Sequence, residues 1–106
     1  LVPPRGAWLV GWQGEEAVAC GGVRLLSPEV CEIKRMYVAP EVRGQGVARQ
    51  LLTRLEMAGS VLGASVVRLD TGRDMAPAVA LYRSAGYQEI PDYNGNPDAG
   101  WWFEKS

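Results

Sequence analysis

The stretch EIKRMYVAPEVRGQGVARQLL, residues 32–52, predicts a strand, a glycine-rich turn and the start of a helix. Arg43, Gly44 and Gly46 stand where the strand gives way to the helix. The first turn of a helix has backbone N–H groups without partners, and it carries the positive end of the helix dipole. We therefore expect this junction to bind an anion, and we expect the rest of the chain to support it.

The strand before the turn has a break in its alternation. Cys31 and Ile33 are apolar at odd positions, whereas Met36 and Val38 are apolar at even positions. Because side chains alternate with a period of two along a strand, this pattern requires an extra residue near residues 34–35. We predict a β-bulge there, which leaves backbone groups unpaired just before the turn. Alternatively, both faces of the strand are buried and the alternation carries little information.

Outward from this stretch, the pattern of apolar residues predicts the other elements. Strands are expected over residues 7–12, 17–26, 31–38, 65–69, 87–90 and 101–105, and helices over residues 47–62 and 77–85. The first helix carries an apolar stripe at helical spacing. Because the strand at 65–69 follows that helix, we expect it to run parallel to the strand before it. The fold class is α/β, with a mixed, mostly antiparallel central sheet and helices on its faces.

The chain has 106 residues, enough for one small domain over residues 1–106. Its formal net charge of -1 argues against a nucleic-acid partner, because domains that bind nucleic acid are usually basic. No apolar run approaches the roughly 20 residues of a membrane span, so we expect no membrane partner. The chain begins with Leu1 and not with Met, and we expect a fragment, a processed form or the ordered part of a longer protein.

The chain contains no histidine, which is the commonest metal ligand and general base, and we expect no metal site. Cys20 and Cys31 do not form a C-x-x-C pair. Without a secretory signal, we expect free thiols in a reducing compartment, which predicts a cytoplasmic location. The two cysteines either face each other across a hairpin or are separate small buried residues.

The glycine turn differs from two common phosphate-binding motifs. It lacks the Gly-Lys-Ser/Thr ending of a P-loop, so it has no candidate for the phosphate lysine or the magnesium hydroxyl. It also departs from the dinucleotide-binding fingerprint, because Arg49 stands where a third glycine would be. The two glycines alone are weak evidence, and a wider pattern is needed to identify the turn.

Three segments resemble motifs of the Gcn5-related N-acetyltransferase (GNAT) superfamily, in the right order across residues 17–105. They are Arg43-x-x-Gly46-x-Ala48 with the flanking Tyr37-Val38 and Leu51-Leu52 (motif A), Ala80–Tyr87 (motif B) and Pro91–Lys105 (the last strands). The resemblance implies the GNAT fold. The family usually begins with a strand and a pair of helices that line the acceptor site, and this chain starts after them, so we expect the domain to be incomplete at its N-terminus.

The resemblance implies acetyl-CoA as co-substrate, and a primary amine of a small molecule or peptide as acceptor. The family's pyrophosphate site maps onto the backbone N–H groups of Arg43, Gly44, Gln45, Gly46, Val47 and Ala48. Val38 would offer its backbone to the thioester carbonyl. Tyr82 aligns with the tyrosine thought to protonate the departing thiolate, which a phenol can do while neutral at pH 7. Many members carry an asparagine or glutamine where this chain has Met75, so one polar contact is absent.

A base must accept the proton of the attacking amine. With no histidine in the chain, a carboxylate is the natural candidate. Glu32 matches a position where the family often carries a glutamate, and we predict it as the base. Asp70 and Glu104 are the alternatives.

Two other functions are compatible with the sequence. One is a non-catalytic acyl-CoA-binding module or a degenerate half of a larger acetyltransferase, which the short N-terminus and Met75 favour. The other is an interaction domain in which Trp101 and Trp102, on an exposed last strand, pair with a partner. A homodimer is common in the family, and the apolar last strand permits one.

Overall fold

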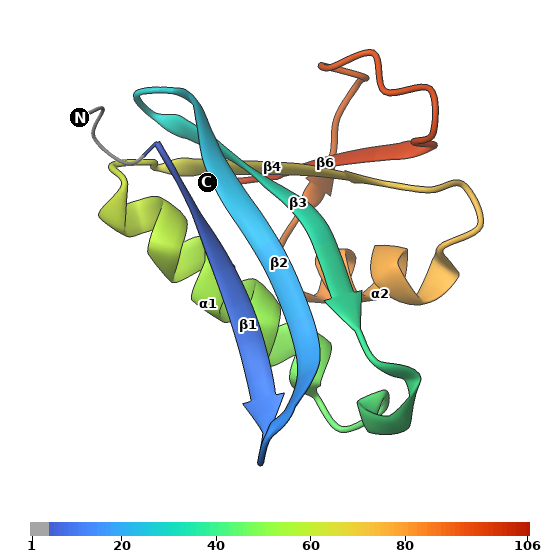
Figure 1. The fold of residues 1–106 in the computed structure, drawn as a ribbon. Coiled ribbons are helices and arrows are strands. Elements are labelled where there is room, and N and C mark those ends of the chain that lie inside the picture. The colour runs from blue at the N-terminus through green and yellow to red at the C-terminus, as the bar shows by residue number, and fades with distance from the viewer. Residues whose placement is uncertain (1–4) are drawn as a thin grey trace.

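A computed structural model describes the chain from residue 5 to residue 106, and Figure 1 labels its main elements. The strands are β1 Gly6–Gln13, β2 Glu16–Ser27, β3 Val30–Val38, β4 Val66–Thr71, β5 Gln88–Glu89 and β6 Trp101–Lys105. The helices are α1 Val47–Val61 and α2 Ala76–Ser84, and a 3-10 helix covers Pro40–Val42. Every expected strand and helix is present in the expected order, and the strand expected over residues 87–90 is shorter than predicted.

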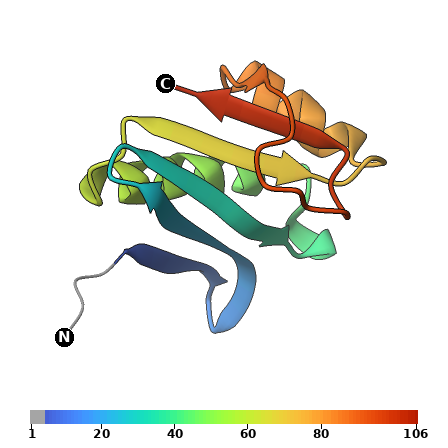
Figure 2. The same cartoon turned by 90° about the horizontal axis from the view of Figure 1, so that it is seen from above.

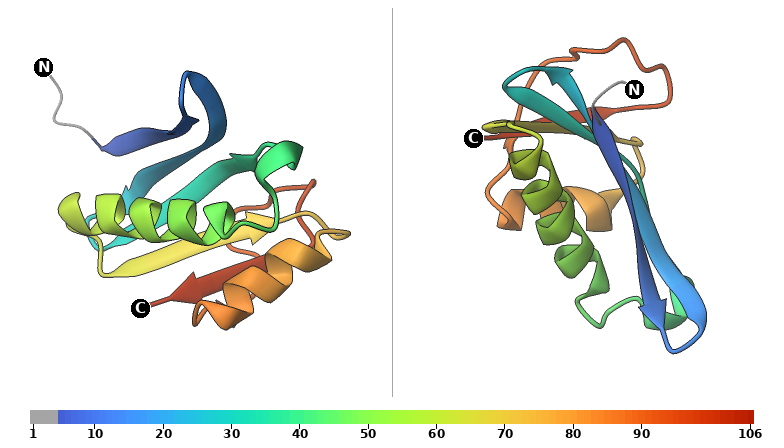
Figure 3. Two further views of the ribbon diagram at one scale, coloured as in Figure 1. Left: turned by 90° about the horizontal axis from the view of Figure 1, so that it is seen from below. Right: turned by 60° about the vertical axis from the view of Figure 1, so that its left-hand side comes forward.

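The strands form one sheet in the order β1-β2-β3-β4-β6-β5. β3 and β4 are parallel, as predicted from the helix between them, and every other neighbouring pair is antiparallel. Figures 2 and 3 show that α1 and α2 lie on the same face of the sheet. The segment between β5 and β6 crosses the opposite face, where it contacts β3. The mixed, mostly antiparallel sheet is therefore confirmed, and its two faces differ in what covers them.

The hydrophobic core lies between the sheet and the two helices. α1 buries Leu51, Leu52 and Leu55, which belong to the predicted apolar stripe, against β2 and β3. Leu69 of β4 and Phe103 of β6 are buried in the same cluster. Burying a side chain of this size stabilises the fold by about 1.5–3 kcal/mol. This packing holds the start of α1, and with it the glycine turn, at a set position beside β3.

Gly59 lets α1 approach β3 closely. A Cβ atom on Gly59 would lie 2.6 Å from the Sγ atom of Cys31, and Cys31 is fully buried. The helix can lie this close to the strand only because the residue has no side chain.

We expect Gly59→Ala to destabilise the protein by on the order of 1 kcal/mol, because overpacking costs about 1–3 kcal/mol and the gain in helix propensity is about 1 kcal/mol. Urea denaturation measures the change. In a Cys31→Ala background the nearest remaining atoms lie 3.5 Å from the new Cβ, so the same substitution should stabilise. An equal loss in both backgrounds would contradict the packing argument.

The predicted bulge is present in β3. Residues 20 and 22 of β2 pair with residues 37 and 34 of β3, so one residue of β2 faces two residues of β3, Arg35 and Met36. Arg35 has a φ of 58°, which is uncommon for a residue with a side chain. Opposite the bulge, a Cβ atom on Gly21 would lie 2.8 Å from Leu55, so this glycine allows a close approach of β2 to α1.

β3 and β4 separate beyond the bulge. Their parallel pairing joins residues 30–33 to residues 66–69 and goes no further. β3 continues to Val38 and β4 to Thr71, and these ends do not pair with each other. The second half of β3 therefore turns an unpaired backbone edge toward the gap between the two strands.

The last strand differs from the expectation. β6 lies between β4 and β5 and is not a free edge of the sheet. Trp101 and Trp102 are half-buried, and both indole N–H groups donate hydrogen bonds within the chain. The exposed tryptophans are instead Trp8 (55%) and Trp12 (65%) on β1. The prediction of an exposed last strand is wrong, because the short β5 and the segment before β6 cover it.

Cys20 and Cys31 are free thiols and are paired in the sheet with Tyr37 and Leu25, not with each other. Of the helices in residues 5–106, none is long and apolar enough to cross a membrane. The same residues contain no group of three or more His, Cys, Asp or Glu side chains placed to hold a metal ion.

Candidate active site

A cleft of about 750 Å³ opens where β3 and β4 separate. Its walls come from the second half of β3, the glycine turn, the end of β4 and the first turns of α2. The structure brings together, in its lining, these residues predicted from the sequence: Val38, Arg43, Gly44, Gly46, Val47, Ala48 and Tyr82. Gln45 belongs to the same turn but does not line the cleft, and Glu32 lies outside it.

The two glycines of the turn have left-handed backbone conformations. Gly44 has a φ of 80° and Gly46 a φ of 78°. A Cβ atom at either position would meet no atom within 4 Å, so the glycines are needed for the backbone conformation and not for space inside the protein. Consequently, no side chain of Gly44 or Gly46 covers the backbone of the turn where it lines the cleft.

In the described part of the chain, the backbone amides from Gly44 to Arg49 lack an acceptor. The first helical hydrogen bond of α1 runs from the N–H of Gln50 to the carbonyl of Gly46, at 3.1 Å. Within residues 5–106, the N–H groups of residues 44–49 donate to no acceptor. These donors, together with the positive end of the α1 dipole, form an arrangement that suits an anion.

The side chain of Arg43 stabilises the glycine turn, whereas its backbone N–H already has an acceptor. Its N–H donates to the carbonyl of Pro40 at 3.3 Å, because residues 40–42 form a 3-10 turn. Its Nε donates to the carbonyl of Val38 at 3.0 Å and so braces the turn against the end of β3. The Arg43 amide therefore already has an acceptor, whereas the amides of residues 44–48 have none within residues 5–106.

Tyr82 lies on α2 and faces the cleft from the side of the helices. Its ring packs against Tyr87 and Phe103, with ring centroids 5.9 Å apart in both cases. Its hydroxyl has no hydrogen-bond partner in residues 5–106, and no fully buried side-chain polar atom in this part of the chain is unpartnered, so the hydroxyl opens into the cleft. Burial, and then the charge of Asp70, raise the pKa of Tyr82. The phenol is therefore neutral at pH 7 and can donate a proton.

Asp70, at the end of β4, also lines the cleft, as does Asp74. Its Oδ2 accepts hydrogen bonds from Lys34 Nζ at 2.8 Å and from the side-chain amides of Asn94 and Asn96. Burial alone would raise the pKa of Asp70, but these hydrogen bonds and the charge of Lys34 lower it below its ordinary value. Asp70 is thus ionised at neutral pH.

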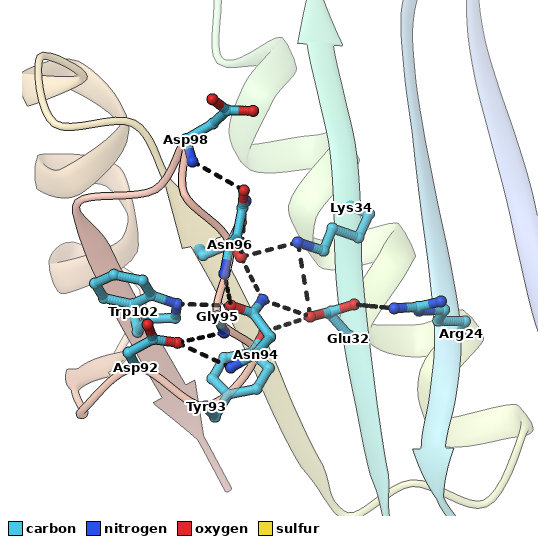
Figure 4. A network of polar contacts seen from close by, with 11 residues as sticks. Arg24, Glu32, Lys34, Asp92, Tyr93, Asn94, Gly95, Asn96, Asp98 and Trp102 are labelled. Carbon is cyan, nitrogen blue, oxygen red and sulfur yellow. Dashed lines mark hydrogen bonds and ion pairs between the residues drawn. The ribbon is translucent and has the colours of Figure 1, made fainter.

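Glu32 is fully buried on the face of the sheet away from the helices (Figure 4). Its Oε1 accepts from Arg24 Nε at 3.2 Å, and its Oε2 accepts from the Tyr93 hydroxyl at 2.6 Å and from Asn94 Nδ2 at 3.2 Å. Lys34 Nζ lies 3.7 Å from the same Oε2. The structure therefore does not bring Glu32 and Tyr82 together. Lys34 and Asn94 contact both Glu32 and Asp70 and link the two carboxylates.

The segment between β5 and β6 is held over Glu32 by its own polar side chains. Asp92 Oδ1 accepts from the amides of Asn94 and Gly95, and Asn94 Oδ1 accepts from the amide of Asn96 and the indole of Trp102. Figure 4 shows this chain of contacts running from the segment to β3.

Sequence reasoning did not identify this segment as part of the site. The available signal was the alternation of Asp and Asn from residue 92 to residue 98, because such side chains close turns by bonding to amides two residues on. Sequence reasoning also missed Arg49. This residue lines the cleft, and its side chain donates to Ser84 Oγ, which links α1 to α2 beside the cleft.

Comparisons with known proteins identify the family of this chain. The model of the acetyltransferase (GNAT) family matches residues 1–87. An uncharacterized N-acetyltransferase from Schizosaccharomyces pombe is 38% identical over 98 residues, which cover 90% of this chain and 60% of that protein. The chain spans only 55–60% of the length of this and two further curated relatives, from Azospirillum brasilense and Escherichia coli.

Solved structures have the same fold. A protein from Klebsiella pneumoniae, provisionally described as an acyl-CoA N-acyltransferase, has a TM-score of 0.85 and 33% identity over 99% of this chain and 74% of its own. A GNAT acetyltransferase from Elizabethkingia anophelis, solved with acetyl-CoA bound, has a TM-score of 0.79 and 17% identity over 94% of this chain and 75% of its own.

Proposed function

Because this chain belongs to the GNAT family of acetyltransferases, we propose that it binds acetyl-CoA in the cleft between β3 and β4 and transfers the acetyl group to a primary amine. The observation that carries the proposal is the row of unpartnered amides at residues 44–48, which lies at one end of the cleft that also contains Tyr82. An anion site and a neutral proton donor on one cleft suit a ligand that has phosphates at one end and a thioester at the other.

We assign the pyrophosphate to the amides of residues 44–48. Each phosphate charge near the exposed start of α1 gains about 0.3–1 kcal/mol from the helix dipole, and the amides add hydrogen bonds. The unpaired edge of β3 up to Val38 would hold the extended pantetheine arm, since that edge offers backbone donors and acceptors that β4 does not use. A backbone N–H of this edge is also the candidate for stabilising the oxyanion.

The proposed reaction is direct transfer. The amine nitrogen attacks the thioester carbonyl carbon, a C–N bond forms, and the C–S bond breaks as the tetrahedral oxyanion collapses. Tyr82 gives its proton to the departing sulfur, and the nitrogen gives one proton to the base. That proton returns to the Tyr82 phenolate through solvent, so no net proton is taken up or released. The hydroxyl that opens into the cleft, with its raised pKa, supports Tyr82 as the acid.

Glu32 stays our proposal for the group that helps remove the proton of the amine. It does not line the cleft, so it would act at a distance, through its charge and through the Lys34 and Asn94 donors that it shares with Asp70. We expect Glu32→Gln to lower kcat/KM about tenfold or more and to change the shape of its pH profile, with little change in acetyl-CoA affinity. Glu89→Gln, which removes a carboxylate paired with Arg83 outside the cleft, is the matched control. A pH profile of unchanged shape would limit Glu32 to a structural role.

Met75 favours a second candidate function. It lies at the start of α2 and lines the cleft, where its thioether offers only a weak hydrogen-bond acceptor, and no side chain caps α2. A non-catalytic acyl-CoA-binding module, or half of a larger acetyltransferase, would tolerate the absence of a polar side chain at this position.

For either function we propose a cytoplasmic location, supported by the two free thiols. Homodimer formation stays a prediction.

Calorimetric titration with acetyl-CoA, followed by measurement of free CoA released in the presence of primary amines, tests the proposal. Binding with release supports the transferase, and binding without release supports the non-catalytic module. If millimolar acetyl-CoA does not bind, both are excluded.

A further inference from the structure

Arg35 has a backbone conformation that suits glycine better than arginine. Its φ is 58°, and it is the only residue with a side chain in residues 5–106 that has a positive φ. Together with Met36 it faces a single residue of β2, and in one common form of such a bulge the first residue is a glycine with a left-handed backbone. Strain of this kind gathers at functional sites. The chain therefore has a strained arginine where glycine would fit without strain, which directs attention to the arginine side chain.

The guanidinium of Arg35 is free in the cleft. The residue lines the cleft and is exposed, and within residues 5–106 its side chain makes no hydrogen bond or ion pair. The other two arginines of the lining have partners, since Arg43 Nε donates to a carbonyl of β3 at 3.0 Å and Arg49 donates to a hydroxyl of α2. Arg35 thus offers a positive charge and a planar set of donors that the rest of this part of the chain does not use.

Arg35 lies at the opposite end of the open β3 edge from the glycine turn. It precedes Val38 by three residues, about 10 Å along an extended strand, whereas the amides of residues 44–48 come after Val38. Coenzyme A has its phosphates on one side of the pantetheine arm and its sulfur on the other. With the pyrophosphate at residues 44–48 and the arm along β3, Arg35 lies on the side of the sulfur. The phosphates of the coenzyme therefore do not account for it.

The cleft also offers apolar surface for a ligand. Tyr37, two residues after Arg35, is 52% exposed, and Met75, at the start of α2, is 50% exposed. Of the two carboxylates in the lining, Asp70 is paired with Lys34 at 2.8 Å, and neither forms an ion pair with Arg35. An unpaired guanidinium near exposed apolar side chains suits a ligand that has both a carboxylate and an apolar group.

We propose that Arg35 binds a carboxylate of the acceptor through two parallel hydrogen bonds. The acceptor is then an amine that also carries a carboxylate, which is the chemistry of an amino acid. This inference rests on the proposed function and deepens it by naming the substrate class. Arg35 determines which amines are acetylated and takes no part in the proton transfers.

The binding test uses sodium 3-phenylpropanoate as the probe and the chain without coenzyme. We expect saturable NMR shifts at the backbone amides of residues 35–37, and no such shifts with 3-phenylpropanamide, which has the same shape without the charge. Arg35→Gln should weaken binding about tenfold or more, because it removes the charge and the paired donors. Arg54→Gln removes an exposed arginine of α1 outside the cleft and should bind like the wild type.

Arg35→Gly separates the loss of binding from a loss of fold. Because glycine adopts a positive φ without strain, this variant should unfold at no lower urea concentration than the wild type and should still lose the probe. Arg35→Lys keeps the charge but not the planar pair of donors, so it should recover only part of the affinity.

The test of specificity compares L-phenylalanine with 2-phenylethylamine, which lacks the carboxylate, in the presence of acetyl-CoA. The wild type should acetylate L-phenylalanine with a kcat/KM about tenfold or more above that of 2-phenylethylamine, because an acceptor without the carboxylate leaves Arg35 unpaired. Arg35→Gln should abolish this preference. A preference for the carboxylated amine that persists in Arg35→Gln would overturn the proposal.

Unchanged affinity for 3-phenylpropanoate in Arg35→Gln and Arg35→Gly, equal shifts with the amide, or shifts confined to residues 44–48 would also overturn it. Because the 3-phenylpropanoate titration needs no coenzyme, its outcome is independent of the acetyl-CoA titration. Failure of acetyl-CoA to bind would refute the proposed function, and failure of 3-phenylpropanoate to bind at Arg35 would refute this inference alone.

Discussion

Gly46→Glu is expected to weaken acetyl-CoA binding at least about 100-fold, which is about 2.7 kcal/mol. The new carboxylate would stand at the amides assigned to the pyrophosphate, where like charges about 4 Å apart repel by about 4 kcal/mol near a protein surface. A residue with a side chain is also strained at the φ of 78° that Gly46 adopts, by about 1–2 kcal/mol, and this strain favours turn conformations that no longer present these amides. Calorimetry measures the change in affinity.

Gly14→Glu is the matched control for this substitution. Gly14 also has a positive φ, 60°, and a Cβ atom there would likewise meet nothing within 4 Å. It lies in the turn between β1 and β2, outside the lining of the cleft. The control should share the backbone strain and the added charge but keep acetyl-CoA affinity. Equal losses in the two variants would show that the glycine turn is not the coenzyme site.

Tyr82→Phe is expected to lower kcat about 100-fold, because it removes the general acid, while acetyl-CoA affinity changes little. Burial and the charge of Asp70 raise the pKa of Tyr82, so the phenol is protonated throughout the neutral range. Activity that depends on it is fully present below the ordinary tyrosine value near 10 and is lost only as the pH rises through the higher value in the folded protein. Steady-state kinetics across this range measures both effects.

Tyr87→Phe is the control for Tyr82. It removes a hydroxyl from the same aromatic cluster, but that hydroxyl donates to Glu56 at 2.7 Å and does not reach the cleft. We expect a loss of about 1 kcal/mol in stability, the usual worth of such a hydrogen bond, and unchanged kcat. If both variants lose turnover equally, packing of the cluster and not proton donation accounts for the effect of Tyr82.

Much of the fold could be predicted because its signals are local. The period of the apolar residues in α1 identified the face that buries Leu52 and Leu55, and Gly63, with a φ of 106°, follows the end of that helix. The break in alternation before the turn identified the bulge at Arg35, since a phase change within one strand is visible without knowing its neighbours. The glycine turn was predicted from the same short stretch.

The other side of the site could not be predicted because it depends on contacts between distant residues. Glu32 meets Tyr93 and Asn94, which lie 61 and 62 residues further along the chain, and no local pattern indicates that pairing. The same limit explains the error about Trp102. Its exposure depends on β5 and on the segment before β6, and the sequence of β6 alone does not show where these lie.

The separation of β3 and β4 divides the sheet into two three-stranded halves. One half contains β1, β2 and β3, and the other contains β4, β6 and β5, so the backbone ladder between them is only the pairing of residues 30–33 with residues 66–69. Opening at this seam breaks few backbone hydrogen bonds, which makes it the natural place for the halves to move apart. A ligand held by both halves would resist that motion and raise the melting temperature as its concentration exceeds its Kd. Occupancy of the cleft would therefore add to the stability of the whole molecule.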